Sequence, residues 1–299
     1  MTLIVELPAA AVSDAASARA VAESALAAAE AAAEHGAALL LPEAPLDGAA
    51  HLDPSVLAGL LSASATGSLV IEADTGRHAP YNLARRIQSL ARILPGRLGV
   101  LLRAGGLDPV TAATAGPERA DADAALVEYA TVLRALQRSF PQDALLGDRE
   151  AGLLADSSKL APAAHRGESY AVAGALNVPL DPALRAAVLG PDHVDGPFDR
   201  RIGRAAGSLR RVLWASDPTA ADRAGIVLDA AQRESLPLVA TTDDGLLVVG
   251  DATALAEAIE RHAPDGALLR PLVSAGRLAV VLRELLPLLP RREPLRRAA

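Results

Sequence analysis

Residues 80–106 read "PYNLARRIQSLARILPGRLGVLLRAGG", and this stretch decides the fold. Its first part predicts a helix over 80–93, and its last third predicts a strand over 97–103 that runs into glycines. The apolar run of the strand is continuous, which is typical of a strand buried on both faces of a parallel sheet. At the end of such a strand we expect polar groups that bind a ligand, and here they are nearly absent.

The same alternation of apolar runs and helical stretches extends outward along the whole chain. The predicted strands are 3–7, 37–43, 68–74, 97–103, 185–190, 209–216, 236–242 and 266–272. The helices that follow them are 14–35, 54–63, 80–93, 120–139, 197–208, 218–235, 251–262 and 275–289. Eight strand–helix units in 299 residues favour an α/β fold, a closed (β/α)8 TIM barrel that forms a single domain over 1–299. An open doubly wound sheet is the alternative.

Two segments depart from this repeat. Residues 140–184 form a long excursion between the fourth helix and the fifth strand, and loops of this length are functional or form a small subdomain. In "VATTDDGLLVV" (239–249), Asp244 and Gly245 separate two apolar runs, which is a hairpin signal. We therefore expect a small β-extension at the seventh strand there, not an acid pair for catalysis.

The middle residues of the apolar runs should form the core. We expect the following side chains to be largely buried: Leu39, Leu40, Val70, Leu101, Val188, Leu213 and Leu269.

Composition excludes several classes of function. The net charge of −7 argues against a nucleic-acid partner, and the absence of cysteine excludes disulfides and thiolate chemistry. The six histidines never recur at a spacing of three or four, so we expect no metal site. No apolar window approaches 18 residues, and the first residues lack the basic region of a signal peptide. We therefore expect a cytoplasmic protein without a membrane span.

The site of a barrel enzyme lies where its strands end, on the loops that lead into the helices. These ends carry Glu43, 73–74, 103–106, 190–193, 215–217 and Arg270. No nucleophile elbow, Walker loop or dinucleotide fingerprint is present, and the sequence identifies no catalytic residue.

Four segments resemble the luciferase-like flavin-dependent monooxygenases, in particular the branch of the nitrilotriacetate and dibenzothiophene-sulfone monooxygenases. The clearest are "APYNLARRIQSLARILPGRLGVLLRAGG" (79–106) and "DREAGLLADSSKLAPAAHRGESYAVAGALNVPLDP" (148–182). The second contains the L-N-V-P that closes the excursion of this branch. Weaker similarity lies in "AAEHGAALLLPEAP" (32–45) and "VVGDATALAEAIE" (248–260). The resemblance spans most of the chain in consistent order.

This resemblance implies a barrel that binds FMN, reduced by a partner flavin reductase, and uses O2 on a small organic substrate. It also implies a homo- or hetero-oligomer. Its cofactor-binding positions fall on Glu43, Arg103, Ala104, Gly105, Gly190 and Asp192.

Several of these positions depart from the family pattern. The family has W-N-x-V-T-S where this chain has "VLLRAG" (100–105), so Leu101, Ala104 and Gly105 replace residues that would hydrogen-bond the flavin. The family has A-G-x-S where this chain has "LGPD" (189–192), which puts the carboxylate of Asp192 in place of a hydroxyl that donates to phosphate. Arg103 favours binding, because a guanidinium can hold a phosphate bidentately. Two readings stay open: an active monooxygenase, or a degenerate barrel that has lost FMN and serves as a non-catalytic subunit or binding protein.

Overall fold

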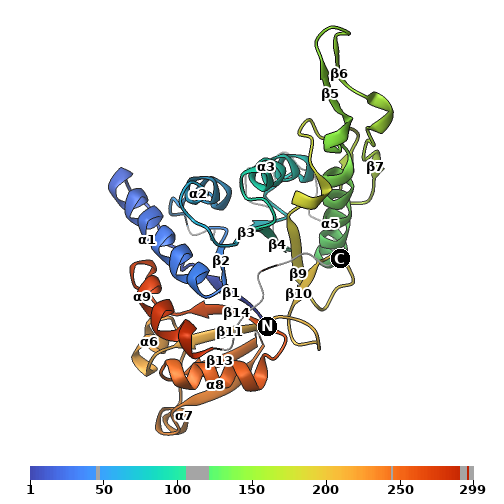
Figure 1. Ribbon diagram of the computed structural model, residues 1–299. Helices are drawn as coiled ribbons and strands as arrows, with labels where there is room; N and C mark the ends of the chain where they lie inside the picture. The colour runs from blue at the N-terminus through green and yellow to red at the C-terminus, as the bar shows by residue number, and fades with distance from the viewer. Residues whose placement is uncertain (45–47, 106–120, 244, 290–294, 296–299) are drawn as a thin grey trace. The chain divides into compact units, whose positions relative to one another are not determined.

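The computed structural model describes residues 1–44, 48–105, 121–243, 245–289 and 295 (Figure 1). The chain forms two compact units, which we describe separately. Unit 1 comprises 1–71, 191–193 and 200–296, and unit 2 comprises 72–190, 194–199 and 297–299. The single domain expected over 1–299 stays a prediction. Of residues 291–297, only residue 295 is described.

Unit 1 is built on a mainly parallel sheet. Its strands lie in the order β2 (Ala38–Leu41), β1 (Thr2–Glu6), β14 (Gly266–Pro271), β11 (Arg210–Ala215), β13 (Gly245–Val249) and β12 (Leu238–Thr242). In register, Val5 lies between Leu39 and Leu269. The first residues of β3 (Leu69–Asp74) continue this sheet beside β2. The short β10 (Arg200–Ile202) also belongs to this unit.

The helices of unit 1 cover this sheet. They are α1 (Ala15–Glu34), α2 (Pro54–Leu61), α6 (Pro218–Arg223), α7 (Ala230–Glu234), α8 (Ala252–His262) and α9 (Ala275–Leu285), with the 3-10 turn η4 (Leu286–Leu288) after α9. Helix α1 lies along α9 (Figure 1). Its buried face consists of alanines, whose small side chains let the two helices approach closely. Asp14 and Ser17 form a capping box that starts α1.

Unit 2 pairs β4 (Leu98–Arg103) in parallel with β9 (Ala187–Pro191), so that Leu101 lies opposite Leu189. Helices α3 (Pro80–Ile93) and α5 (Ala122–Arg138) pack on one another. The excursion 140–184 supplies no strand to the large sheet. It forms two small hairpins, β5 (Leu145–Asp148) with β6 (Leu153–Ala155) and β7 (His165–Arg166) with β8 (Ala171–Val172), and the 3-10 turns η1 (Gln142–Ala144), η2 (Ser157–Lys159) and η3 (Pro182–Leu184).

The end of the excursion is bound to α3 through backbone carbonyls. The Tyr81 hydroxyl donates to the carbonyl of Ala175 (3.3 Å), and the Gln88 amide donates to that of Val178 (2.9 Å). Arg92 donates to the carbonyl of Pro179 (3.1 Å). The two clearest segments of the family resemblance, 79–106 and 148–182, are therefore in direct contact. We call residues 175–179 the strap.

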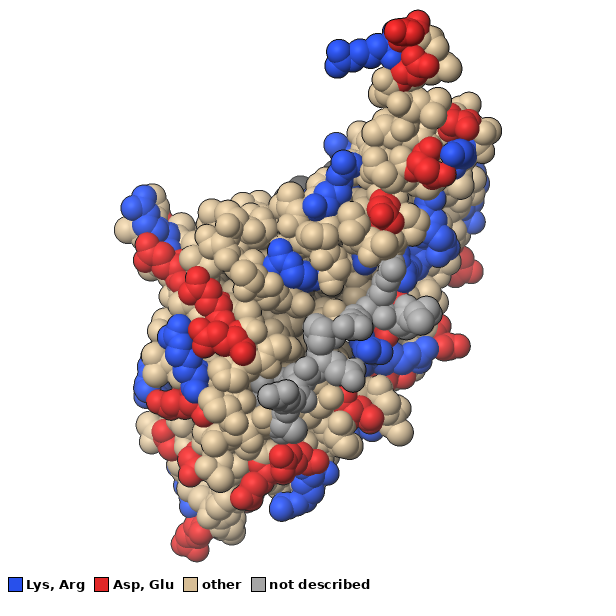
Figure 2. Space-filling view, viewed as in Figure 1, with Lys and Arg blue, Asp and Glu red and all other residues tan. Residues whose placement is uncertain are grey.

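The hairpin β5–β6 extends from the rest of the excursion (Figure 1). Leu146, Leu153 and Leu154 on it are exposed, and Leu154 has 73% of its surface accessible. Figure 2 shows charged residues of both signs at its tip, where the sequence reads "DREAG" (148–152), and both signs interspersed over the rest of the visible face.

The predicted core is confirmed for all but one residue. Leu39, Leu40, Val70, Leu101, Val188 and Leu269 are buried. Leu213 is only half-buried, which corrects our expectation for this position. It packs at the border of a small cluster that includes Ala220 and Ala221 of α6, together with other hydrophobic residues that are only partly buried.

The α/β class is confirmed, but the sequential strand order of a closed barrel is not what unit 1 shows. In a barrel of the predicted strands, β14 would lie between β1 and the seventh strand, which is predicted over 236–242 and observed as β12. In unit 1, β14 pairs with β1 and β11, and β11 pairs in turn with β14 and β13. A strand has two edges, so neither β12 nor β13 is a neighbour of β14. The strand order of unit 1 therefore differs from that of the predicted closed barrel with a 140–184 excursion.

Three further expectations need correction. The hairpin at 239–249 is present, but its second arm, β13, is the parallel strand, whereas β12 runs antiparallel to it. Asp244 at its turn lies outside the described residues. The helix predicted over 197–208 is absent, and this stretch holds β10 and turns. The helix predicted over 218–235 is interrupted at Gly225, whose φ of 78° is unfavourable for other residues and ends α6.

Candidate functional site

The carboxyl ends of β3 and β4 in unit 2 hold a network of charged side chains. Arg103 lies 3.5 Å from Glu72 and 3.9 Å from Asp74. Asp74 also lies 3.7 Å from Arg77 and accepts the N–H of Gly76 (2.8 Å). The Arg103 side chain remains 47% exposed, whereas Asp74 is buried. Arg103 is thus an accessible cation, but two carboxylates already offset its charge.

Ala104 and Gly105 follow Arg103 as the chain leaves β4. A Cβ on Gly105 would overlap the carboxylate of Asp74, so glycine is the residue that lets this buried acid occupy its position. Ala104 is half-buried. Gly106, the next residue, lies outside the described residues.

Gly190 is the residue before the last of the neighbouring strand β9, one position beyond the pair Leu101–Leu189. The space that a Cβ would fill is taken by the ring of Phe198. Gly190 and Phe198 both belong to unit 2, and the residues between Val194 and Asp199 are anchored there by ion pairs of Asp199 with Arg134 and Arg185. Gly190 therefore seats an aromatic ring of its own chain.

Asp192 and Glu43 belong to unit 1. The Asp192 carboxylate accepts the N–H of Ala205 (2.6 Å) and fills the space above Gly203. This aspartate therefore stabilises the turn that follows β10. Glu43 is half-buried, two residues after the end of β2.

These six residues are a poor electrostatic fit for the phosphate of FMN. A phosphate needs cations and N–H donors, yet Arg103 faces the carboxylates of Glu72 and Asp74. The N–H of Ala205 already donates to the carboxylate of Asp192. The structure brings Arg103, Ala104, Gly105 and Gly190 to the ends of two neighbouring strands of unit 2. Their role in binding a cofactor stays a prediction.

The excursion reaches the end of β3 through Tyr170. Its hydroxyl donates to the carbonyl of Thr75 (3.3 Å), and its ring meets that of Tyr129 edge to face at 5.2 Å. Glu128 accepts the N–H groups of Ser169 (3.0 Å) and Tyr170 (2.9 Å) and lies 2.9 Å from His165. Burial would raise the pKa of Glu128, but the hydrogen bonds from His165 and the two backbone groups outweigh it and lower that pKa.

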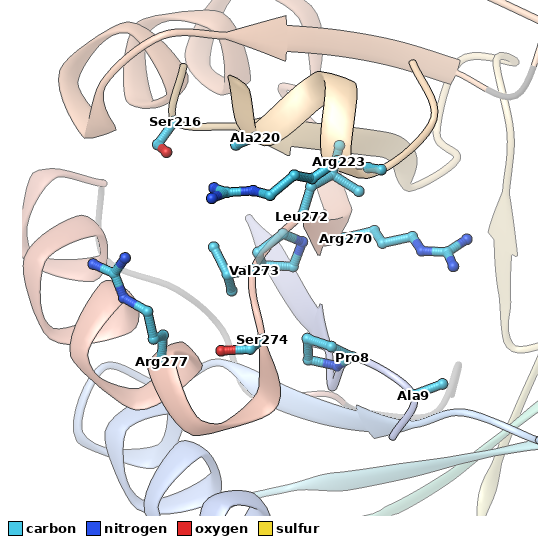
Figure 3. A pocket seen from close by; sticks show the side chains of 12 residues that line it. Pro8, Ala9, Ser216, Ala220, Arg223, Arg270, Leu272, Val273, Ser274 and Arg277 are labelled. Atoms are coloured by element: carbon cyan, nitrogen blue, oxygen red, sulfur yellow. The ribbon is translucent and has the colours of Figure 1, made fainter. Parts of the chain in front are cut away.

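Sequence reasoning missed most of a second site, a pocket of about 570 Å³ in unit 1 (Figure 3). It opens where β1, β11 and β14 end, and volumes of this size accommodate small-molecule ligands. The strand-end rule pointed to two of its residues, Ser216 and Arg270. It did not point to Arg223 and Arg277, because these lie within the helices α6 and α9 that follow the strands.

The described residues include no group of three or more His, Asp or Glu side chains placed to hold a metal ion. Among these same residues, every helix is too short or too polar to cross a membrane.

No protein-family model and no curated protein match this chain. Solved structures do. A riboflavin lyase, crystallised with a modified FMN and riboflavin, is 18% identical with a TM-score of 0.66, and the match covers 96% of this chain and 90% of that one. The EDTA monooxygenase of Chelativorans sp. BNC1 is 20% identical with a TM-score of 0.65, over 97% and 95% of the two chains. A long-chain alkane monooxygenase is 13% identical with a TM-score of 0.68, over 96% and 90%.

At these identities the likeness shows a shared fold. The structures with this fold include two monooxygenases and a lyase crystallised with a modified FMN, so the resemblance drawn from the sequence is confirmed at the level of the fold.

Proposed function

We propose that this chain is a flavin-dependent monooxygenase of the luciferase-like class. It would use FMN, reduced by a separate flavin reductase, and O2 to oxidise a small organic substrate. The observation that supports this proposal is the likeness to flavin monooxygenases over 96–97% of the chain. A fold by itself hosts many functions, so the proposal depends on whether a flavin binds.

The test is a titration of FMN into the purified protein, followed by fluorescence quenching. An active flavoprotein should bind oxidised or reduced FMN with a Kd of about 1–10 μM, which corresponds to roughly 7–8 kcal/mol. Reduced FMN supplied by a generic flavin reductase with NADH should then give protein-dependent O2 uptake, measured as the difference from the background of free reduced FMN, which reacts with O2 on its own. Binding no tighter than about 100 μM in both redox states, with no such uptake, would reject the proposal.

A second candidate function is a binding protein or non-catalytic subunit that keeps the fold without flavin chemistry. The pairing of Arg103 with Glu72 and Asp74 favours it, because these carboxylates repel a phosphate where the resemblance places one. The double variant Glu72→Gln, Asp74→Asn separates the two functions. If FMN binding appears only in this variant, the carboxylates exclude the cofactor and the second function holds.

We also infer an oligomer in solution, as the resemblance implies. Chromatography with light scattering measures it directly, and a monomeric mass would reject this inference and leave the flavin proposal untouched.

A further inference from the structure

The pocket of unit 1 gathers arginines from three elements. Arg223 comes from α6, Arg270 from the end of β14 and Arg277 from the first turn of α9. In Figure 3 the guanidinium groups of Arg223 and Arg277 lie on the same side of the pocket as the Ser216 hydroxyl, whereas Arg270 points the other way.

Arg270 is already paired, because its Nε lies 3.4 Å from the carboxylate of Glu6. Within the part of the chain that the structure describes, no ion pair within 4 Å joins Arg223 or Arg277 to a carboxylate. Asp217, six positions before Arg223, is the N-cap of α6 and accepts the N–H of Ala220 (2.8 Å) and the hydroxyl of Ser216 (3.0 Å), and its interaction with Arg223 is a weaker, purely electrostatic one. Asp222 on α6 is held by Arg233. The two arginines therefore keep donors that the neighbouring acids do not use.

The start of α9 adds backbone donors to the same pocket. Its N-cap, Ser274, makes no side-chain hydrogen bond to the first turn, although Ser274 lines the pocket. The helix has 11 residues, and its N-terminus carries a partial positive charge. Apolar side chains, Leu272 and Val273, form the remaining wall. A cationic end and an apolar wall suit a small organic anion.

We propose that Arg223 and Arg277 form an oxyanion site, which binds a carboxylate or phosphate group of a small ligand in this pocket. Guanidinium groups match the planar geometry of a carboxylate and the oxygens of a phosphate, and each can donate two parallel hydrogen bonds. The site goes beyond the flavin proposal and stands without it. The anion has two possible sources, the phosphate of a nucleotide-like cofactor or the carboxylate of an acidic substrate.

The experiment is calorimetric titration of the full chain with citrate and with inorganic phosphate, in a low-salt buffer and without flavin. We expect saturable binding of at least one of them with a Kd of about 0.1–1 mM, which weakens as salt is added. Arg223→Gln and Arg277→Gln should each weaken it about tenfold. The matched control is Arg283→Gln, an exposed arginine on α9 outside the pocket, which should bind like the parent.

A second arm identifies the source of the anion. If the site takes a cofactor phosphate, inorganic phosphate should compete with FMN for binding. Arg277→Gln should then weaken the binding of FMN but leave the binding of riboflavin, which has no phosphate, unchanged. If the site takes a substrate carboxylate, citrate should bind, and neither inorganic phosphate nor the Arg277→Gln substitution should change the affinity for FMN. Absence of saturable binding of both anions, or equal binding by parent and the two pocket variants, would overturn the proposal. The first arm contains no flavin. If the anions bind and flavin does not, the proposed function is rejected and the oxyanion site stands.

Discussion

At the scale of single residues, the end of β4 depends on a glycine. The carboxylate of Asp74 lies where a Cβ of Gly105 would be, and Asp74 is fixed by Gly76, Arg77 and Arg103. We expect Gly105→Ala to destabilise the protein by about 1–3 kcal/mol, because a buried acid must move away from its partners.

Urea denaturation measures this change. The control is Gly174→Ala, since Gly174 has a negative φ and open space around its Cβ position. Equal denaturation midpoints for the two variants would contradict the role of Gly105.

The lowered pKa of Glu128 predicts how the free energy of unfolding changes as the pH falls. Its pKa in the folded protein lies below the ordinary value, so its contribution is complete above about pH 4.3 and is lost as the pH falls through the folded pKa. Glu128→Gln should therefore cost about 1–2 kcal/mol at pH 7, because two backbone N–H groups lose a charged acceptor.

The difference in unfolding free energy between parent and Glu128→Gln should shrink between pH 5 and 3. Because His165 contacts Glu128, the series is repeated in a His165→Ala background. A difference that stays constant from pH 7 to 3 in both backgrounds would show that Glu128 is not the group responsible.

At the scale of elements, one buried aspartate joins three parts of unit 2. Asp199 pairs with Arg134 of α5 and with Arg185, and it accepts the N–H of Val188 in β9 (2.7 Å). Burial lowers the pKa of Arg134, partly offset by its hydrogen bond to Asp199. We expect Asp199→Asn to cost about 3–5 kcal/mol, because it leaves a buried guanidinium without its counter-charge.

Thermal and urea unfolding would both show this loss. Asp195→Asn is the control, because Asp195 lies in the same segment but is exposed. If Asp199→Asn unfolds like this control, the ion pair does not anchor residues 194–199.

At the scale of the whole molecule, the sequence predicts where the helices and strands lie along the chain better than it predicts which strands pair with one another. Helix 80–93 coincides with α3, and the predicted strands overlap the observed ones. Most of these strands are apolar runs of the kind that buried strands show, whereas β12 is only partly buried. The order β1–β14–β11–β13 could not be read in this way, since such a run signals burial on both faces and not which strand lies on either edge.

The candidate sites show the same limit. Arg103 was identified as a cation at a strand end, but its pairing with Glu72 and Asp74 depends on how β3 and β4 align, which composition does not encode. Arg223 and Arg277 come together from helices more than fifty positions apart in the chain. Only the fold makes them neighbours.

The place of β14 also bears on the order of assembly during synthesis. Among the described residues this is the last strand, yet it lies between β1, the first, and β11. A nascent chain that ends before residue 266 holds two separate groups of strands, each with an open apolar edge. Unit 1 can therefore complete its sheet only once residues 266–271 have left the ribosome, and ribosome-bound chains arrested before that point should be far more sensitive to protease than those arrested after it.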